Sequence, residues 1–179
     1  MKMAYATELV GTYFLVLTVG LTTLAQSPLA PLAIGSSLMI MVYMGGHVSG
    51  AHYNPAVTLA VWMRGKLPAR DVIPYWVAQL VGAVLAALTA LWWTGHTFAA
   101  APGTDVSWGR AVAVEAVSTF ALALVVLNSA TARQTEKNSF YGLAIGFTIT
   151  VAAFAGGSIS GGAFNPAVGV GLMIIDATM

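Results

Sequence analysis

Two copies of the tripeptide Asn-Pro-Ala are the residues whose types and spacing most clearly suggest a chemical role. They comprise Asn54, Pro55 and Ala56, and Asn165, Pro166 and Ala167. Asparagine is a preferred N-cap and proline is favoured at the first helical position, so each triplet predicts the start of a helix. The N-terminus of a helix carries about +0.5 of an elementary charge. Two such ends facing each other would donate hydrogen bonds and repel cations, which suits a narrow path for neutral hydroxylic solutes.

The two triplets belong to an internal repeat. Residues 45–57 and residues 156–168 are identical at eight of thirteen aligned positions. A second match pairs residues 6–15 with residues 113–122, and each of these segments carries one glutamate. A unit of three full helices and one half-helix crosses a membrane an odd number of times. Two successive copies would therefore point in opposite directions, as in the inverted repeats of many transport proteins.

The composition predicts a chain embedded in a membrane. Hydrophobic residues make up 58% of the sequence and charged residues 7%, whereas about 25% of the residues of a soluble domain are charged. A helix that crosses a bilayer needs about 20 apolar residues. The stretches of suitable length are 3–25, 31–46, 72–94, 107–129 and 140–156. The first exceeds the apolar core of a signal peptide, which has about 7 to 15 residues, so we interpret it as a retained helix.

Two shorter stretches, 55–64 and 166–175, each begin at the proline of an Asn-Pro pair. Ten helical residues span about 15 Å, half of a bilayer core. We therefore predict two half-helices that enter from opposite faces and meet near the midplane. Glycine-rich connections, 45–53 and 156–164, precede them, and we expect irregular backbone there. Such backbone is tolerated at membrane depth where it borders water, so these connections would line a cavity.

The positions of the positive charges predict the topology, because Lys and Arg accumulate on the cytoplasmic side. If five helices alternate in direction, only Arg110 falls on the outer side. The residues on the other side are Lys2, Arg64, Lys66, Arg70, Arg133 and Lys137. We expect a multi-pass protein of the cell membrane with a cytoplasmic N-terminus. The lipid bilayer is the expected partner and nucleic acid is not, because no basic patch is interleaved with aromatic residues.

With these features the sequence resembles the major intrinsic proteins, the aquaporins and aquaglyceroporins. The resemblance extends over essentially the whole chain and rests on the paired motifs SGAHYNPAV and SGGAFNPAV. It implies an all-α integral membrane fold with an inverted repeat, six full helices and two re-entrant half-helices, one pore per subunit and usually a homotetramer. It also implies a passive channel for water or small neutral solutes such as glycerol, urea or ammonia, with no enzymatic activity and no cofactor.

The resemblance assigns roles to particular residues. Glu8 and Glu115 match glutamates that hold the two pore loops in place, and Gln79, within YWVAQLVGA, matches a glutamine that we interpret as packing between helices. The matching pore-loop residues are His47, Ser49, Gly50, His52, Ser160 and Gly161. We expect the two histidines to bind backbone groups or to lie at the pore mouth rather than to bind metal, because no third ligand is near. The sequence contains no cysteine, which removes thiolate metal sites.

The first departure from the family pattern concerns the outer constriction of the pore. The family usually has an arginine directly after the second Asn-Pro-Ala, and this sequence has Val168. By the family's spacing, the other positions of the constriction are Ile34, Ala153 and Gly162. None of these residues is aromatic, cationic or histidine. We therefore expect a wide, apolar filter, closer to that of channels for larger neutral solutes than to that of a strict water channel.

The second departure concerns the C-terminal part of the sequence. Only residues 176–179 follow the second half-helix, so we expect a single channel domain, 1–179, without a sixth full helix. Its repeats would cover about residues 1–94 and about residues 107–179. Either a fragment or a degenerate family member would give this pattern, and a non-conducting role stays open.

Two further classes of function remain as alternatives. An ion-coupled transporter would need a membrane-buried Asp or Lys at its site, whereas the predicted full helices carry only the two repeat glutamates as acidic residues. An intramembrane serine hydrolase would pair Ser49 or Ser160 with His52. The serines, however, occur symmetrically in both repeats, which catalysis does not require.

Overall fold

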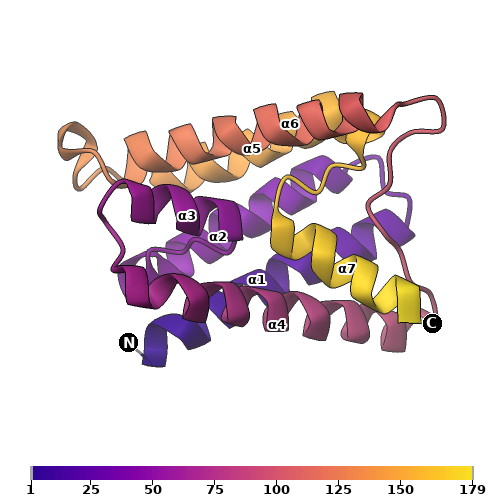
Figure 1. Ribbon diagram of the computed structural model, residues 1–179, viewed down its shortest axis with the longest axis horizontal. Helices are drawn as coiled ribbons and strands as arrows, with labels where there is room; N and C mark the ends of the chain where they lie inside the picture. Colours follow the sequence, from indigo (N-terminus) through magenta and orange to yellow (C-terminus); the bar gives the residue numbers. More distant parts are fainter. Residues whose placement is uncertain (1, 179) are drawn as a thin grey trace.

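The computed structural model describes residues 2–178 as a bundle of helices (Figure 1). The helices are α1 (Lys2–Leu24), α2 (Ala30–Ser49), α3 (Pro55–Met63), α4 (Ala69–Thr94), α5 (Trp108–Ala130), α6 (Tyr141–Ser160) and α7 (Pro166–Thr178), with a 3-10 turn, η1 (Arg133–Thr135), before α6. Five of them, α1, α2, α4, α5 and α6, are long and apolar enough to cross a membrane. The five predicted spans are confirmed, and α3 and α7 are the two short helices expected after Asn-Pro.

The helices α2 and α6 extend further than expected from the sequence. The prediction of irregular backbone is wrong for the first five residues of each glycine-rich connection, and the non-helical segments are only 50–54 and 161–165. In a membrane, a helix provides hydrogen bonds for its own backbone N–H and C=O groups. A helix is therefore expected to continue until it reaches a residue whose backbone conformation ends it. Gly50 and Gly161 do so, because they adopt left-handed conformations with φ of 86° and 95° and donate their N–H groups to carbonyls four residues earlier.

The helix α4 begins earlier than expected and therefore includes Asp71 in its first turn. Asp71 is buried, and one of its carboxylate oxygens accepts a hydrogen bond from the hydroxyl of Tyr5 at 2.7 Å. A carboxylate in the first turn of a helix is stabilised by the helix dipole. The long helices thus carry a third acidic residue besides the two repeat glutamates, at the end of the bundle where the N-terminus lies.

The helices α2 and α6 pack directly against each other at Gly35 and Gly146. A Cβ atom built on Gly35 would lie 2.5 Å from the carbonyl oxygen of Gly146, and one built on Gly146 would meet the carbonyl oxygen of Gly35. The two glycines are 111 residues apart, which is also the offset between Asn54 and Asn165. The contact therefore joins equivalent positions of the two repeats, and any side chain there would push the two helices apart.

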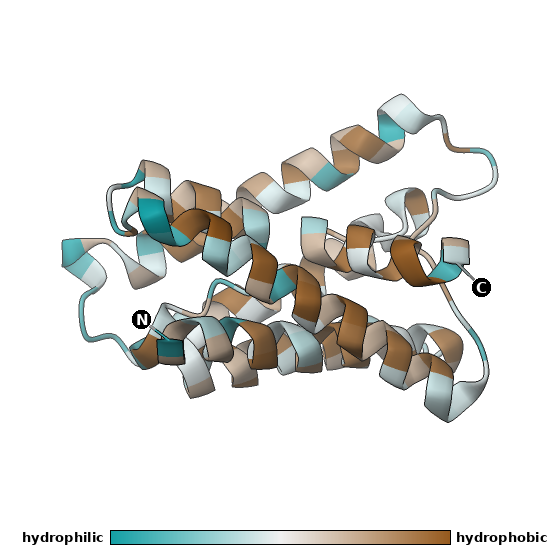
Figure 2. Cartoon of the chain, turned by 60° about the horizontal axis from the view of Figure 1, so that its bottom comes forward, coloured by the Kyte–Doolittle hydropathy of each residue, from teal (hydrophilic) through white to brown (hydrophobic). Residues whose placement is uncertain are grey.

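The two ends of the bundle differ in charge. The N-terminus and the loops 64–68 and 131–140 lie at one end, on the left of Figure 1, and the loops 25–29 and 95–107 lie at the other. The six cationic residues predicted on one side of the membrane all belong to the first end. Between the ends, strongly hydrophilic residues are few (Figure 2), and many large hydrophobic side chains of the long helices are exposed, as a bilayer requires.

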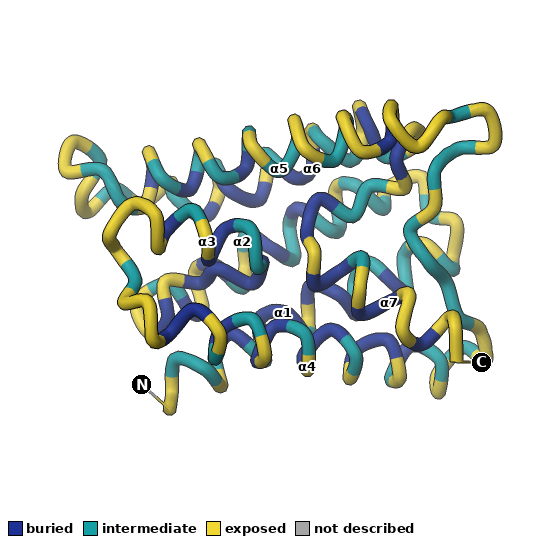
Figure 3. Tube along the Cα trace, viewed as in Figure 1, coloured by how far each residue is buried: buried dark blue, intermediate teal, exposed yellow. Residues whose placement is uncertain are grey.

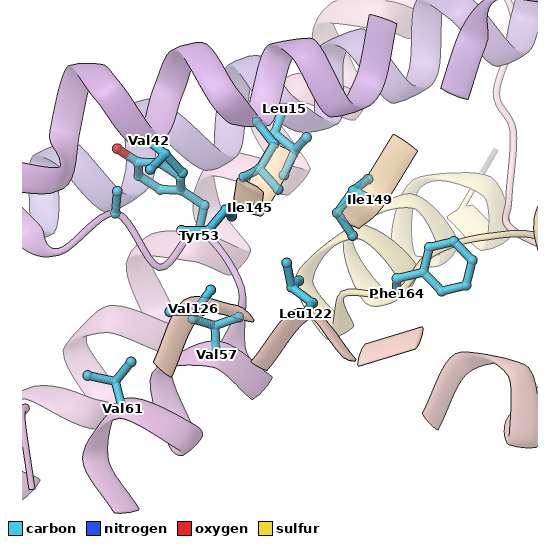
Figure 4. Close-up of a cluster of buried hydrophobic side chains, with 12 residues drawn as sticks. Leu15, Val42, Tyr53, Val57, Val61, Leu122, Val126, Ile145, Ile149 and Phe164 are labelled. Carbon is cyan, nitrogen blue, oxygen red and sulfur yellow. The ribbon is translucent and has the colours of Figure 1, made fainter. Parts of the chain in front are cut away.

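The short helices α3 and α7 lie between the long helices with one side exposed, and their N-terminal ends point toward the centre of the bundle (Figure 1). Both pack against α4, and α3 also packs against α5. The inner sides of these helices are buried (Figure 3). The loop residues Tyr53 and Phe164 join the hydrophobic cluster of the long helices, which includes Leu15, Leu122 and Ile149 (Figure 4). The core thus fixes where the two Asn-Pro-Ala triplets lie.

Candidate functional site

The two Asn-Pro-Ala triplets meet in the interior of the bundle. Asn54 caps α3, since its Oδ1 accepts a hydrogen bond from the backbone N–H of Ala56 at 2.9 Å. Asn165 precedes α7 in the same way, and its Oδ1 accepts from the N–H of Ala167 at 2.9 Å. Each triplet therefore starts a helix, as predicted, with asparagine in the N-cap position.

The same two asparagines join the loops to each other. Nδ2 of Asn54 donates to the carbonyl oxygen of Phe164 at 3.0 Å, and Nδ2 of Asn165 donates to the carbonyl oxygen of Tyr53 at 2.8 Å. A primary amide has two N–H groups, so one N–H of each asparagine is left for another acceptor. Both asparagines line a central cavity. The site can therefore offer two hydrogen-bond donors to a molecule between the helix ends.

Glu8 of α1 holds the first loop through four hydrogen bonds. Its Oε1 accepts from the hydroxyl of Ser49 at 2.7 Å and from the backbone N–H of His52 at 2.9 Å. Its Oε2 accepts from the N–H of Tyr53 at 2.7 Å and from Nε2 of Gln79 at 2.8 Å. The carboxylate is fully buried, and these four donors replace the water that it loses on burial. Gln79 thereby connects α4 to the loop.

Glu115 of α5 makes equivalent contacts with the second loop, with one donor fewer. It accepts from the hydroxyl of Ser160 at 2.6 Å and from the backbone N–H groups of Ala163 and Phe164. It is half-buried and lines an open groove of about 540 Å³ between α5 and α7. In the first repeat, α4 covers the corresponding side of Glu8. Within residues 2–178, no helix covers this side of Glu115.

The central cavity between the two asparagines is narrow. It leaves about 30 Å³ for the centres of water molecules, and a single water needs about 10–15 Å³ by this measure. Its walls away from the loops are aliphatic: Leu15, Val19, Ile34, Leu38, Val57, Leu122, Val126, Ile145, Ile149 and Val168. Branched side chains from several helices therefore line the space. The wide, apolar outer filter expected from the sequence stays a prediction.

Three of the four residues predicted for the outer constriction line this cavity, namely Ile34, Gly162 and Val168. Val168 is only 2% exposed and packs in a cluster with alanines of α4. The fourth residue, Ala153, packs against the core of the bundle and is not part of the cavity wall. Ile149, one turn earlier on the same face of α6, is the residue that reaches the cavity.

A wider vestibule of about 700 Å³ adjoins the cavity at the end where the N-terminus lies. Four of the predicted pore-loop residues line it: His47, Ser49, Gly50 and His52. The other two lie elsewhere. Ser160 lines the groove beside Glu115, and Gly161 packs against the loop 95–107, where a built Cβ atom would lie 2.6 Å from the backbone nitrogen of Ala101.

The polar residues of the loops do not form a hydrolytic or metal-binding arrangement. Ser49 and Ser160 each donate their hydroxyl hydrogen to a glutamate rather than to a histidine. In the part of the chain that the structure describes, no group of three or more His, Asp or Glu could hold a metal ion. The loop contacts therefore position the two helix ends.

Two supporting residues were not identified from the sequence. The hydroxyl of Tyr75 donates to the carbonyl oxygen of Ser49 at 2.7 Å. The hydroxyl of Thr58 accepts from Nε2 of Gln79 at 2.9 Å. Tyr75 lies four residues before Gln79, and residues at this spacing share a helix face. That spacing was the available signal for Tyr75, whereas nothing in the sequence distinguished Thr58.

A sequence profile of the family described as Major intrinsic protein matches residues 2–178. The chain belongs to this family. Major intrinsic proteins are a family of membrane channels, and this chain is a multi-pass membrane protein of that family. The sequence-based assignment to the family is thereby confirmed.

This major intrinsic protein is similar to several curated aquaporins. It is 37% identical over 155 residues to the Probable aquaporin AqpM of Archaeoglobus fulgidus, and the aligned region covers 83% of this chain and 63% of that protein. It is 36% identical over 178 residues to Aquaporin NIP1-1 of Zea mays, and the aligned region covers 94% of this chain and 63% of that protein. The chain therefore spans 63% of the length of each of these two relatives.

The fold is similar to that of the aquaglyceroporin from Plasmodium falciparum. The TM-score is 0.88, and the similarity covers 98% of this chain and 81% of that one. The two sequences are 22% identical, so the similarity establishes the fold alone. That fold is all-helical and membrane-embedded, and the short helices α3 and α7 are consistent with its half-helices.

Proposed function

We propose that the chain forms a passive channel for water and small neutral solutes such as glycerol, urea or ammonia, and that its paired Asn-Pro-Ala motifs exclude ions and protons. The observation that carries this proposal is the crossed pair of asparagines. The remaining N–H groups of Asn54 and Asn165 border a cavity that has room for a short file of waters. A neutral molecule with an acceptor oxygen suits such a site.

The electrostatics of the site favour neutral solutes over cations. Two helix N-termini place about one positive charge in total near the centre. The aliphatic wall offers a dehydrated ion few oxygen ligands. An oxygen atom that accepts hydrogen bonds from both asparagines points its own hydrogens away from them. The file of waters is then interrupted at that point, and a proton path is interrupted with it.

The outer filter in this proposal is apolar and uncharged. The place of Ile34, Gly162 and Val168 in the cavity wall supports including them in this filter, and the family's spacing alone supports including Ala153. Without an arginine after the second Asn-Pro-Ala, a solute does not have to compete with a cation and its bound water. The filter would then admit solutes with an apolar body, within the size that the narrow cavity allows.

Two alternative functions have weaker support. An ion-coupled transporter needs a charged group in its pathway, but neither Glu8 nor Glu115 is part of the cavity wall, and loop donors hold both of them. A non-conducting family member has one observation in its favour. The open groove beside Glu115 leaves the support of the second loop uncovered on one side. Permeability measurements distinguish this alternative from a channel.

Stopped-flow measurements on proteoliposomes test the channel function. Liposomes that contain the chain are expected to shrink in hyperosmotic sucrose faster than empty liposomes and to admit glycerol, urea or ammonia. Proton and sodium entry are expected to stay at the level of empty liposomes. Water and solute permeability equal to that of empty liposomes would favour the non-conducting alternative, and sodium-dependent accumulation against a gradient would favour the transporter.

We further propose that residues 1–179 act as one channel domain, with repeats at about 1–94 and about 107–179, and that it assembles as a homotetramer. An open apolar groove between α5 and α6 is lined by several alanines. Small residues let membrane helices approach closely, which supports a contact between subunits at this groove. Chemical crosslinking in liposomes is expected to give a ladder that ends at four chains. A monomer at every protein-to-lipid ratio would contradict the assembly.

The proposed location is the cell membrane, with the N-terminus in the cytoplasm. The support is the positive charge at the end of the bundle that includes the loop 131–140. The chain lacks cysteine, so single cysteines can report the sidedness of each loop. A membrane-impermeant maleimide is expected to label Leu29→Cys in intact cells and Gln134→Cys only after permeabilisation. The reverse pattern would invert the topology.

A further inference from the structure

The junction between the central cavity and the vestibule is formed by three side chains, His52, Val126 and Ile145, which line both spaces. We call this junction the neck. His52 is 5% exposed and is the only polar side chain of the three. A solute that moves between the cavity and the vestibule therefore passes one imidazole and two aliphatic groups.

Neighbouring groups fix the orientation of this imidazole. The backbone N–H of His52 is held by Glu8 at 2.9 Å, and its ring packs against the ring of Tyr75 with the centroids 5.1 Å apart. Nδ1 lies 3.2 Å from Oγ1 of Thr58, which is buried, so this nitrogen faces the protein interior. Nε2 lies beside Gly50, 3.1 Å from where a Cβ atom would be. Gly50 lines the vestibule, so Nε2 lies on the side of the ring toward the vestibule.

The hydrogen bonds around Thr58 indicate which ring nitrogen carries the proton. The Glu8 carboxylate only accepts, so Gln79 must turn its NH₂ group toward it, and the second N–H of that group donates to Oγ1 of Thr58 at 2.9 Å. The Thr58 hydroxyl donates its own hydrogen to the carbonyl oxygen of Asn54 at 3.1 Å. The lone pair that remains on Oγ1 can only accept. All three contacts of Thr58 are satisfied together when Nδ1 of His52 carries the proton.

The other tautomer makes one hydrogen bond fewer. If Nε2 carried the proton, Nδ1 would be an acceptor, and the single hydrogen of the Thr58 hydroxyl would have to choose between Nδ1 of His52 and the carbonyl oxygen of Asn54. A series of hydrogen bonds thus connects the carboxylate to the pore, from Glu8 through Gln79 and Thr58 to His52. Because the carboxylate only accepts, the amide of Gln79 donates both to it and to Thr58, and Thr58 then accepts from His52. The result is an acceptor at Nε2.

We propose that His52 is held with its proton on Nδ1, so that Nε2 is a fixed hydrogen-bond acceptor that determines specificity at the neck. This proposal rests on the proposed channel function. Asn54 and Asn165 donate hydrogen bonds to a solute at the centre, and His52 accepts one from it at the neck. The matched solutes carry a donor and an acceptor on one small neutral molecule, as water, alcohols and urea do. A solute that can only accept leaves Nε2 without a partner and is disfavoured.

Solid-state ¹⁵N NMR of the full chain in liposomes tests the tautomer, because protonated and unprotonated imidazole nitrogens resonate at well-separated shifts. The sequence contains three histidines, and the substitutions His47→Gln and His96→Gln remove the other two signals. The expected spectrum at neutral pH has a protonated Nδ1 and an unprotonated Nε2. A protonated Nε2 with an unprotonated Nδ1 overturns the proposal.

A pair of substitutions at Thr58 tests the origin of the tautomer. Thr58→Val removes the acceptor with little change in shape and is expected to move the population toward the form protonated at Nε2. Thr58→Ser keeps the hydroxyl and is expected to keep the wild-type spectrum. An unchanged spectrum in Thr58→Val would mean that Thr58 does not set the tautomer.

Urea entry into the same liposomes tests the specificity. His52→Phe removes the acceptor and keeps a ring, and the loss of one hydrogen bond is expected to slow urea entry about two- to tenfold. His52→Gln can offer a carbonyl oxygen to the neck and is expected to retain more of the entry. Equal urea entry in the wild type and both variants overturns the specificity role. If the wild type admits water but no urea above empty liposomes, the specificity role fails and the channel function stands. If it admits neither water nor any neutral solute, the channel function fails as well, and the NMR spectrum still decides the tautomer.

Discussion

At the scale of single residues, Glu8 and Glu115 form a matched pair, because equivalent carboxylates hold equivalent loops. Glu8 is fully buried with four donors, and Glu115 is half-buried with three. Replacing either by glutamine turns one acceptor oxygen into a donor that faces other donors. A buried donor without a partner costs about 1–3 kcal/mol.

We therefore expect Glu8→Gln to lower the free energy of unfolding by about 1–3 kcal/mol, and Glu115→Gln to lower it by less. Water or lipid headgroups can reach the exposed side of Glu115, and one donor fewer is left unpaired there. Denaturant titration in detergent micelles, followed by circular dichroism, measures both. Equal losses in the two variants would mean that the open groove beside Glu115 does not weaken its role.

Val168 offers a second prediction at this scale. Its side chain lines the cavity where the family usually has an arginine. We expect Val168→Arg to slow glycerol and urea entry into proteoliposomes by about tenfold or more, which corresponds to about 1.4 kcal/mol at the barrier, because a guanidinium and its bound water fill an apolar space. Water permeability should fall less than solute permeability.

Val168→Thr is the matched control for the charge, because threonine has nearly the shape of valine and no net charge. Solute entry through this variant is expected to remain close to that of the wild type. If Val168→Arg admits glycerol and urea as fast as Val168→Thr does, residue 168 does not belong to the filter.

The sequence was informative about polar site residues and uninformative about apolar ones. Asn54, Asn165 and Glu8 stand out because a polar group in a membrane segment needs a partner, and the repeat showed that they come in pairs. Leu122 and Leu124 of α5 look alike in the sequence, yet the first lines the cavity and the second is 43% exposed to the surroundings of the bundle. Positions that face lipid and positions that line an apolar pore wall both carry aliphatic side chains, so hydropathy could not distinguish the two kinds of position.

At the scale of helices, the contact between α2 and α6 depends on the absence of two side chains. A Cβ atom on Gly146 would meet the carbonyl oxygen of Gly35, whereas one on Gly157, in the same helix, would meet nothing within 4 Å. We expect Gly146→Ala to lower the free energy of unfolding by about 1–3 kcal/mol through overpacking. Gly157→Ala should be neutral or stabilising by up to about 1 kcal/mol, because alanine favours helix.

The same unfolding titration measures both glycine variants. A loss in Gly157→Ala as large as that in Gly146→Ala would show that helix packing at Gly35 is not the cause. Retention of full stability in Gly146→Ala would mean that α2 and α6 can separate without cost, which contradicts a rigid crossing between the repeats.

The existence of every long helix followed from apolar length, but the ends of α2 and α6 did not. Glycine pairs in the connections suggested irregular backbone, although among these glycines only Gly50, Gly161 and Gly162 adopt left-handed conformations and the others are helical. In the sequence, a glycine that ends a helix cannot be distinguished from a glycine that permits close packing of two helices. Which one applies depends on the neighbouring helix, and that information is not local to the segment.

At the scale of the whole molecule, the two repeats have equivalent loops, but neighbouring helices cover the first loop more completely than the second. The first loop lies between α1 and α4, while the second borders the open groove between α5 and α7. The sequence predicted the repeat from the matched motifs and its inversion from the odd number of membrane crossings in each unit. The groove follows only from three-dimensional packing, because the sequence does not say which face of α5 a neighbouring helix would cover.

If solutes cross through the cavity between the two asparagines, paired tryptophan substitutions in α5 should distinguish this route from any other. Leu122 is 2% exposed and lines the cavity, and Leu124, two residues later, faces outward. Tryptophan at 122 would fill a space of about 30 Å³, whereas tryptophan at 124 would contact lipid. Unfolding titrations of both variants show whether each one folds.

The measurement is the osmotic water permeability of proteoliposomes that contain the wild type, Leu122→Trp or Leu124→Trp. A route through the cavity predicts that liposomes with the wild type or Leu124→Trp shrink faster than empty liposomes, and that liposomes with Leu122→Trp shrink at the rate of empty liposomes. Leu122→Trp liposomes that shrink as fast as Leu124→Trp liposomes, or wild-type liposomes that match empty ones, would contradict it.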